Sequence, residues 1–222
     1  MTMVKIVKPP EIAALPVNKA GYVIPWFVDR DADLPDGEPD FRIADSRKMR
    51  DAIRFELCWV CGKRRGQFGS FVVGPMCAIN RTSSEPPCHL ACAVYSARAC
   101  PFLTTPRMTR RERHMPEDHI SPAGVMLKRN PGVTLVYTSR TFKPFRVSNG
   151  LLWDMGTAVS TAWFAEGRAA HLVEVLASIE SGIGSLAEVA SEEGPEAVAE
   201  LEHRRAELEE SLRRQYATEG TS

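Results

Sequence analysis

The sequence predicts an α+β protein in two parts: an α+β domain over residues 1–147, and a helical C-terminal region over residues 148–222 that packs on it or mediates dimerisation. Three observations predict this: paired Cys and His residues near the middle, short apolar or β-branched runs around them, and apolar residues at three- and four-residue spacing near the C-terminus. With 222 residues, 44% hydrophobic and 25% charged, the chain has the composition of a globular protein of one or two domains.

The N-terminal part is expected to hold two short strands and one helix. Residues 21–28 read as an edge strand interrupted by Pro25, and residues 41–43 as a second strand. Asp45 then occupies a capping position for a helix over residues 46–57, whose apolar residues share one face. This helix leads directly into the cysteine-containing segment.

Two pairs of soft metal ligands follow in the next 35 or so residues. Cys58 and Cys61 form a Cys-x-x-Cys turn followed by Gly62, a residue suited to the positive φ that such a turn often needs. His89 and Cys92 lie three residues apart, at a spacing that places both side chains on one face of a helical turn. Four such donors match a closed tetrahedral zinc site, so we predict one structural Zn²⁺ bound by Cys58, Cys61, His89 and Cys92.

The residues between the two pairs support this prediction. Residues 67–73 are aromatic and β-branched between glycines, which indicates a hairpin strand, and Pro86 and Pro87 are typical of a helix start. A Cys-x-x-Cys turn, a hairpin and a helix that carries the second ligand pair together resemble a treble clef. The sequence thus predicts a small treble-clef-like segment with a short antiparallel sheet.

Other cysteine assignments stay open at this point. Cys88 competes with His89, because Cys88 and Cys92 are also neighbours on a helix; spacing favours His89. Cys100, before Pro101, could reach the site as a substitute ligand, although packing as a small apolar side chain is the favoured interpretation for it and for Cys77. A disulfide framework is disfavoured, because the chain starts without a signal peptide and is long enough for a core.

Charge is distributed unevenly although the net charge is zero. Residues 58–146 carry 14 Lys and Arg against 4 Asp and Glu, a net +10, and residues 147–222 carry a net −9. A basic segment can bind nucleic acid by neutralising phosphates, and the candidate contacts are Lys63, Arg64, Arg65, Arg110, Arg111, Arg113, Lys128 and Arg129. Alternatively, the acidic C-terminal helices cover the basic segment within one molecule or in a dimer.

The second half of the chain is predicted to change from strands to helices. Residues 104–121 read as a loop, and residues 124–127 and 133–137 flank a turn at 130–132, with a third strand over 140–147. Residues 151–165 are expected to form a helix; a second helix begins near Leu172 and ends at residues 182–184, and a capping box at residues 185–188 starts a short third one. The last helix is expected over residues 195–216, with ion pairs Glu200–Arg204, Glu209–Arg213 and Glu210–Arg214. It packs antiparallel within the domain or forms a homodimer contact.

The cysteine pattern also resembles known proteins. The runs at residues 58–62, 74–78, 86–89, 92–93 and 99–103 are similar to a group of uncharacterised proteins encoded by bacteriophages, prophages and bacterial genomes. More distantly, the ligand pairs resemble small zinc-binding proteins of actinobacteria, in which a cysteine stands in place of His89; this favours His89 over Cys88. The resemblance implies a phage-type protein in the cytoplasm of a bacterial host cell and names no activity.

Three function classes remain. The favoured one is a non-enzymatic, zinc-stabilised accessory protein that binds nucleic acid through the basic segment, because a site closed by four protein ligands argues against catalysis at the metal. The second is a protein-interaction module. The third is a treble-clef nuclease, which is disfavoured because residues 66–76 contain no histidine. No apolar run is long enough to cross a membrane, so no membrane partner is expected.

Overall fold

The computed structural model describes residues 6–30, 38–106, 108–109, 123 and 130–219. Its helices are α1 Ser46–Arg54, α2 Pro75–Asn80, α3 Leu90–Ala99, α4 Pro101–Thr104, α5 Leu172–Glu193 and α6 Pro195–Glu219. Its strands are β1 Gly69–Val73, β2 Thr82–Ser83, β3 Thr134–Ser139, β4 Lys143–Val147, β5 Gly150–Asp154, β6 Ala158–Ala165 and β7 Arg168–Ala169. Helices and antiparallel sheets with a helical C-terminus confirm the predicted α+β class.

Two antiparallel sheets form the framework. The larger sheet has the strand order β1-β3-β6-β7, and the smaller one has the order β2-β5-β4. In the larger sheet, Phe71 of β1 is paired with Tyr137 of β3, which is paired with Thr161 of β6. Strand β1 was expected to belong to a local hairpin, but within the described residues its strand partner is β3, more than 60 residues along the chain.

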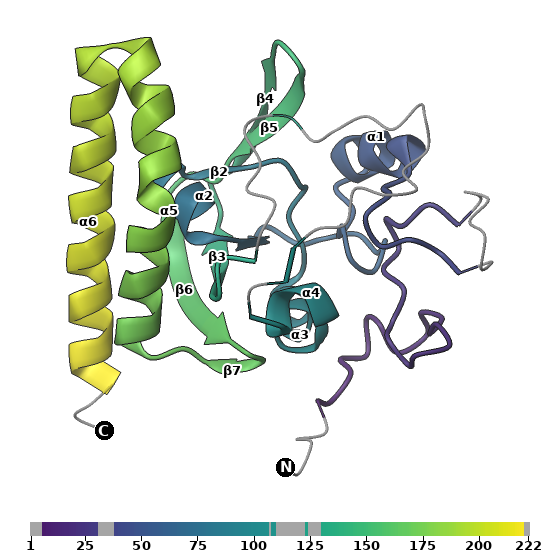
Figure 1. Cartoon of the computed structure of the whole chain (residues 1–222). Coiled ribbons are helices and arrows are strands. Elements are labelled where there is room, and N and C mark those ends of the chain that lie inside the picture. Colours follow the sequence, from purple (N-terminus) through teal and green to yellow (C-terminus); the bar gives the residue numbers. More distant parts are fainter. Residues whose placement is uncertain (1–5, 31–37, 107, 110–122, 124–129, 220–222) are drawn as a thin grey trace.

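The larger sheet has apolar side chains on both faces, because successive residues of a strand point to opposite sides. Leu135 and Tyr137 of β3 belong to the core under α2, α5 and α6, whereas Val136 between them belongs to the core around the cysteines. Figure 1 shows the result: the α5–α6 hairpin lies on one side of the sheet, and α3 and α1 lie on the other. The cysteine-containing segment and the acidic helices are therefore separated by the sheet.

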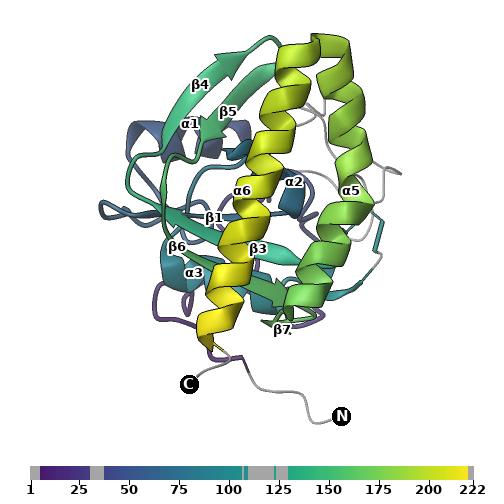
Figure 2. The same cartoon turned by 90° about the vertical axis from the view of Figure 1, so that its left-hand side faces the viewer.

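The C-terminal helices form an antiparallel hairpin that covers the sheet (Figure 2). Contrary to the prediction of a stop at residues 182–184, α5 is continuous from Leu172 to Glu193. Gly182 lies against α2, where a Cβ atom would be 3.1 Å from the Sδ of Met76, so this glycine permits close packing. The three predicted ion pairs of α6 are present, and Arg205 also bridges to Glu180 of α5 at 2.7 Å.

Predictions for the first half are mixed. Asp45 caps α1 as expected, since its carboxylate accepts a hydrogen bond from the Arg47 amide at 2.8 Å. Residues 21–28 and 41–43 are not strands; Val28 and Ala44 form an isolated bridge instead. The loop predicted at 104–121 and the strand predicted at 124–127 lie largely or wholly outside the described residues.

The helix predicted over residues 151–165 is wrong, because these residues form most of β5, all of β6 and the turn between them. Trp153 and Trp163 were expected in the core and are buried there, 3% and 4% exposed, but on strands. Strand β4 pairs with β5 across residues 147 and 148, the predicted domain boundary. Figure 1 shows this hairpin extending away from the larger sheet.

Candidate metal centre

The first ligand pair lies in a tight turn after α1. The Gly62 amide donates to the Cys58 carbonyl at 2.8 Å, and the Cys58 amide donates to the Lys63 carbonyl at 2.8 Å. Gly62 has a φ of +71°, and a Cβ atom there would lie 2.6 Å from the ring of Trp26. Both the backbone conformation and the close approach of Trp26 therefore require glycine.

The second ligand pair lies at the start of α3. His89 is the N-cap residue of α3 and Cys92 is inside its first turn, whereas the sequence had predicted a helix start at Pro86 and Pro87. The preceding residue, Cys88, exchanges two backbone hydrogen bonds with Ser70 of β1, at 2.7 and 2.9 Å. These bonds hold the beginning of α3 against the sheet and fix the place of His89.

The four predicted ligand residues come together. The Sγ atoms of Cys58, Cys61 and Cys92 and a ring nitrogen of His89 all lie within 4.8 Å of one another, and this group could hold a metal ion. The Nδ1 atom of His89 is 3.3 Å from the Sγ of Cys61 and 3.9 Å from that of Cys92. Tetrahedral zinc needs its sulfur and nitrogen ligands roughly 3.5–3.8 Å apart, so the spacing suits such an ion.

A hydrogen bond orients the histidine ring. The Nε2 atom of His89 lies 3.0 Å from the carbonyl oxygen of Arg64 and donates its proton to it, since a carbonyl can only accept. The proton on Nε2 leaves the lone pair of Nδ1 directed at the three sulfurs. Metal-ligating histidines commonly make such a bond from the other ring nitrogen, because it fixes the tautomer and the ring orientation.

The thiols are mutually hydrogen-bonded. The pKa of Cys58 lies far below its ordinary value because the Cys61 thiol, and then the Cys88 and Cys92 thiols, hydrogen-bond to its sulfur. The bond with Cys58 raises the pKa of Cys61 to about 11. The His89 amide also lies 3.3 Å from the Sγ of Cys58, which favours the thiolate. The cysteine sulfurs are thus close enough to share protons, which they would have to release in order to bind a metal ion.

In three comparisons, no protein-family model, no curated protein and no solved structure matches this chain. The site itself therefore carries the functional argument.

The remaining cysteines lie outside the four-donor group. Cys88 is buried and its thiol is hydrogen-bonded to Cys58, yet it is not among the four clustered donors. Cys77 lies in α2, where burial raises its pKa to about 11. Cys100 is the N-cap residue of α4 and does not join the group as a substitute ligand.

The predicted phosphate-binding residues separate into three sets. Lys63 and Arg64 follow the cysteine turn, and the Arg64 side chain is 79% exposed. Arg65 was predicted as a phosphate contact, but its side chain is buried, with its guanidinium 5.0 Å from the centre of the Phe142 ring and its Nε 3.3 Å from the Leu57 carbonyl oxygen. The other five, Arg110, Arg111, Arg113, Lys128 and Arg129, lie outside the described residues.

Sequence reasoning missed two arginine–phenylalanine pairs near the same turn. The guanidinium carbon of Arg54 lies 5.1 Å from the ring centre of Phe55, and that of Arg140 lies 5.2 Å from the ring centre of Phe68. Both rings are exposed, Phe55 at 50% and Phe68 at 46%. One signal in the sequence could have indicated these pairs. Both phenylalanines have charged or polar neighbours, and neither belongs to the apolar face of a predicted helix or strand.

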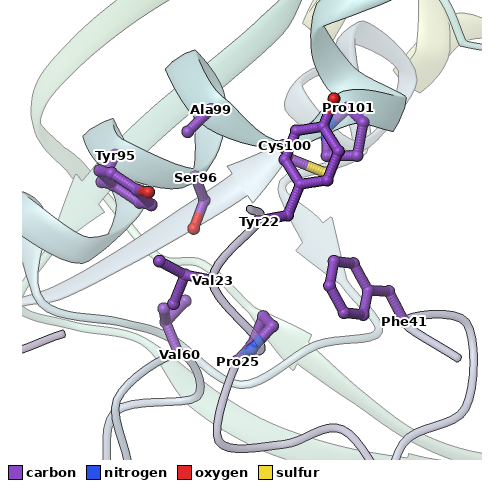
Figure 3. Close-up of a pocket in the computed structure, with 10 residues that line it drawn as sticks. All are labelled: Tyr22, Val23, Pro25, Phe41, Val60, Tyr95, Ser96, Ala99, Cys100 and Pro101. Carbon is purple, nitrogen blue, oxygen red and sulfur yellow. The ribbon is translucent and has the colours of Figure 1, made fainter. Parts of the chain in front are cut away.

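Two surface hollows offer little chemistry. One, of about 50 Å³, lies between α3 and the N-terminal segment (Figure 3), and its lining includes Val60, Tyr95 and Cys100. Burial raises the pKa of Cys100, so its thiol is protonated at neutral pH. The other, of about 560 Å³, contains Arg81, Lys143 and Arg204, but each pairs with a carboxylate, so the hollow is not a cationic site. No helix in the described part of the chain is long and apolar enough to span a membrane.

Proposed function

We propose that Cys58, Cys61, His89 and Cys92 bind one structural Zn²⁺. The donor set supports this: three cysteine sulfurs and one imidazole nitrogen, all within 4.8 Å of one another, suit zinc, whereas magnesium and calcium prefer oxygen ligands. All four ligands come from the protein, which leaves no open position for a substrate. The ion would join the turn after α1 to the start of α3 and complete the core around the cysteines.

We further propose that the chain is a non-enzymatic accessory protein that binds nucleic acid through the basic turn at Lys63 and Arg64. The observation that carries this proposal is the hydrogen bond from His89 Nε2 to the Arg64 carbonyl, because this bond connects the metal site to the basic turn and restricts the motion of the turn. The Lys63 amide also hydrogen-bonds to the Cys61 sulfur. An ordered pair of exposed cations can neutralise phosphates at a smaller entropic cost than a disordered one.

The acidic helices are poorly placed to mask this turn. They pack on the opposite face of the larger sheet from the cysteines. Within the described residues, the ion pairs that join residues 58–146 to residues 147–222 are Arg81 to Glu207 at 3.0 Å and Lys143 to Asp154 at 4.0 Å, and neither involves the basic turn. This arrangement favours an accessible basic surface over a covered one.

The test combines metal analysis with salt-dependent binding. Purified full-length protein should contain about one zinc per chain and should bind an oligonucleotide more weakly as salt rises. Replacing Lys63 and Arg64 with Ala should lower the slope of log affinity against log salt by about 2, whereas Arg213→Ala with Arg214→Ala on α6 should leave it unchanged. Chelation should abolish binding, and zinc should restore it.

Two results would contradict the proposal. Zinc content well below half an equivalent after mild purification removes the structural metal. Zinc-loaded protein that binds no nucleic acid at low salt removes the nucleic-acid role and leaves the protein-interaction module in its place. A nuclease is the less favoured candidate, because residues 66–76 lack the histidine that such a mechanism needs; a magnesium-dependent nicking assay tests it directly.

A further inference from the structure

Two phenylalanine rings near the candidate metal centre are exposed to solvent. Large apolar side chains are ordinarily buried, yet Phe55 and Phe68 are each about half exposed. Each ring lies beside a guanidinium, at 5.1 Å for Arg54 and 5.2 Å for Arg140. Each of the two exposed rings thus has a guanidinium beside it.

Backbone and side-chain contacts connect the two pairs through Arg65, the residue after the basic turn. The backbone carbonyl oxygen of Glu56, next to Phe55, accepts a hydrogen bond from the Arg65 amide at 2.8 Å. Arg65 lies over Phe142, and Phe142 packs so closely on Gly69 that a Cβ atom there would be 2.6 Å from the ring. Gly69 follows Phe68 and pairs with Ser139, the residue before Arg140. We call the exposed residues along this path the arginine–phenylalanine strip: Arg54, Phe55, Lys63, Arg64, Phe68 and Arg140.

The strip is cationic. It carries four positive charges, and within the described residues the carboxylate within ion-pair distance of them is Glu56, 3.7 Å from Arg64, with both side chains well exposed. Arg140 donates to the neutral side chain of Gln67 at 2.7 Å. Exposed pairs such as Glu56 with Arg64 contribute little to stability and exchange readily for another anion.

Resting on the proposed function, we propose that the arginine–phenylalanine strip binds single-stranded nucleic acid. Unpaired bases stack on the exposed rings of Phe55 and Phe68 and on the guanidinium planes of Arg54 and Arg140 beside them, while Lys63 and Arg64 contact the phosphates. Bases in a duplex are already stacked on one another and present no face to a protein ring, whereas unpaired bases stack readily on aromatic and guanidinium surfaces. A site that used phosphates alone would not need two exposed rings.

The experiment compares a 20-nucleotide DNA strand with the duplex of the same sequence. Zinc-loaded, full-length protein is titrated into each, with fluorescence anisotropy as the readout, at one fixed salt concentration. The single strand should bind about tenfold more tightly or better. Phe55→Leu and Phe68→Leu should each weaken single-strand binding roughly tenfold and leave duplex binding unchanged, because leucine keeps apolar bulk but has no flat π-face.

Matched variants separate stacking from charge and from folding. Phe68→Tyr should retain the affinity, and Tyr22→Leu, at a ring 41% exposed on the N-terminal segment, should have no effect. Arg140→Lys keeps the charge but not the planar group, so it should preserve the salt slope while weakening single-strand binding. Zinc content and circular dichroism of every variant should match those of the parent.

The outcomes distinguish this inference from the proposed function. Salt-dependent binding that is equal for strand and duplex and insensitive to Phe55 and Phe68 overturns the single-strand inference and leaves the proposed function intact. Absence of binding to either form overturns both. If a polyglutamate peptide is bound and the oligonucleotides are not, and the same variants abolish that binding, the strip is a docking surface for acidic protein segments instead.

Discussion

The Nε2 atom of His89 lies 3.0 Å from the carbonyl oxygen of Arg64, so one imidazole both faces three cysteine sulfurs and holds the basic turn. This relationship makes a separation of roles testable. His89→Cys should keep about one zinc per chain, because four thiolates also form structural zinc sites. It should nevertheless weaken oligonucleotide binding several-fold, because the turn loses its hydrogen bond. Metal analysis and anisotropy on the same sample check this; unchanged affinity would show that the bond does not order the turn.

The ligand assignment can be tested by comparing two adjacent residues. His89→Ala should lose the metal and destabilise the core around the cysteines, because binding free energy at such a site is folding free energy. Cys88→Ser should keep the metal, since Cys88 is buried beside Cys58 but outside the four-donor group. Cys58→Ser, Cys61→Ser and Cys92→Ser serve as positive controls for loss. The reverse pattern, with zinc retained in His89→Ala and lost in Cys88→Ser, would make Cys88 the ligand.

Arg65 should contribute to the stability of the fold and not to nucleic-acid binding. Arg65→Ala should lower the free energy of unfolding by about 2 kcal/mol, because it removes a buried guanidinium that covers Phe142 and bonds to the Leu57 carbonyl. Arg65→Met should cost less, since it fills the same space without a charge to desolvate. Arg64→Ala, on the exposed side of the same turn, should stay within about 0.5 kcal/mol of the parent. Urea unfolding measures all three; equal effects at positions 64 and 65 would contradict the buried role.

The two glycines in α5 should respond differently to alanine. Gly184 has open space where a Cβ would lie, so Gly184→Ala should stabilise the protein by up to about 1 kcal/mol through helix propensity. Gly182→Ala gains the same propensity but places its Cβ 3.1 Å from Met76, which is buried, so the gain should be reduced or reversed. The urea midpoints of the two variants decide this. An equal gain in stability at both positions would show that α2 can move away from the new Cβ atom without loss of stability.

The sequence was sufficient for local chemistry. The spacing of Cys58, Cys61, His89 and Cys92 predicted which donors would meet, because one tight turn and one helix start determine the geometry within each pair. Capping at Asp45 and the ion pairs of α6 were also predictable, since they depend on residues two to four positions apart.

Features that depend on distant residues were not predictable in this way. Residues 151–165 contain strands covered partly on both faces, and such strands lose the simple alternation of a half-exposed strand, so their sequence resembles that of a helix. Gly182 was read as a helix stop because nothing nearby shows that Met76 would pack on it. Strand β1 pairs with residues 134–139, which are too far along the chain for a local pattern to indicate them. The exposure of Phe55 and Phe68 likewise depends on how distant segments pack.

The position of β3 has a consequence for how the chain is made. All four donors leave the ribosome before β3, which is the strand that joins β1 to β6. A nascent or truncated chain ending before β3 could therefore capture its ion while β1 still lacks its neighbour and Phe71 and Val73 lack the helices that cover them. Metal loading would then precede completion of the sheet, and a prematurely ended product would be metal-bound yet prone to aggregate through an open strand edge.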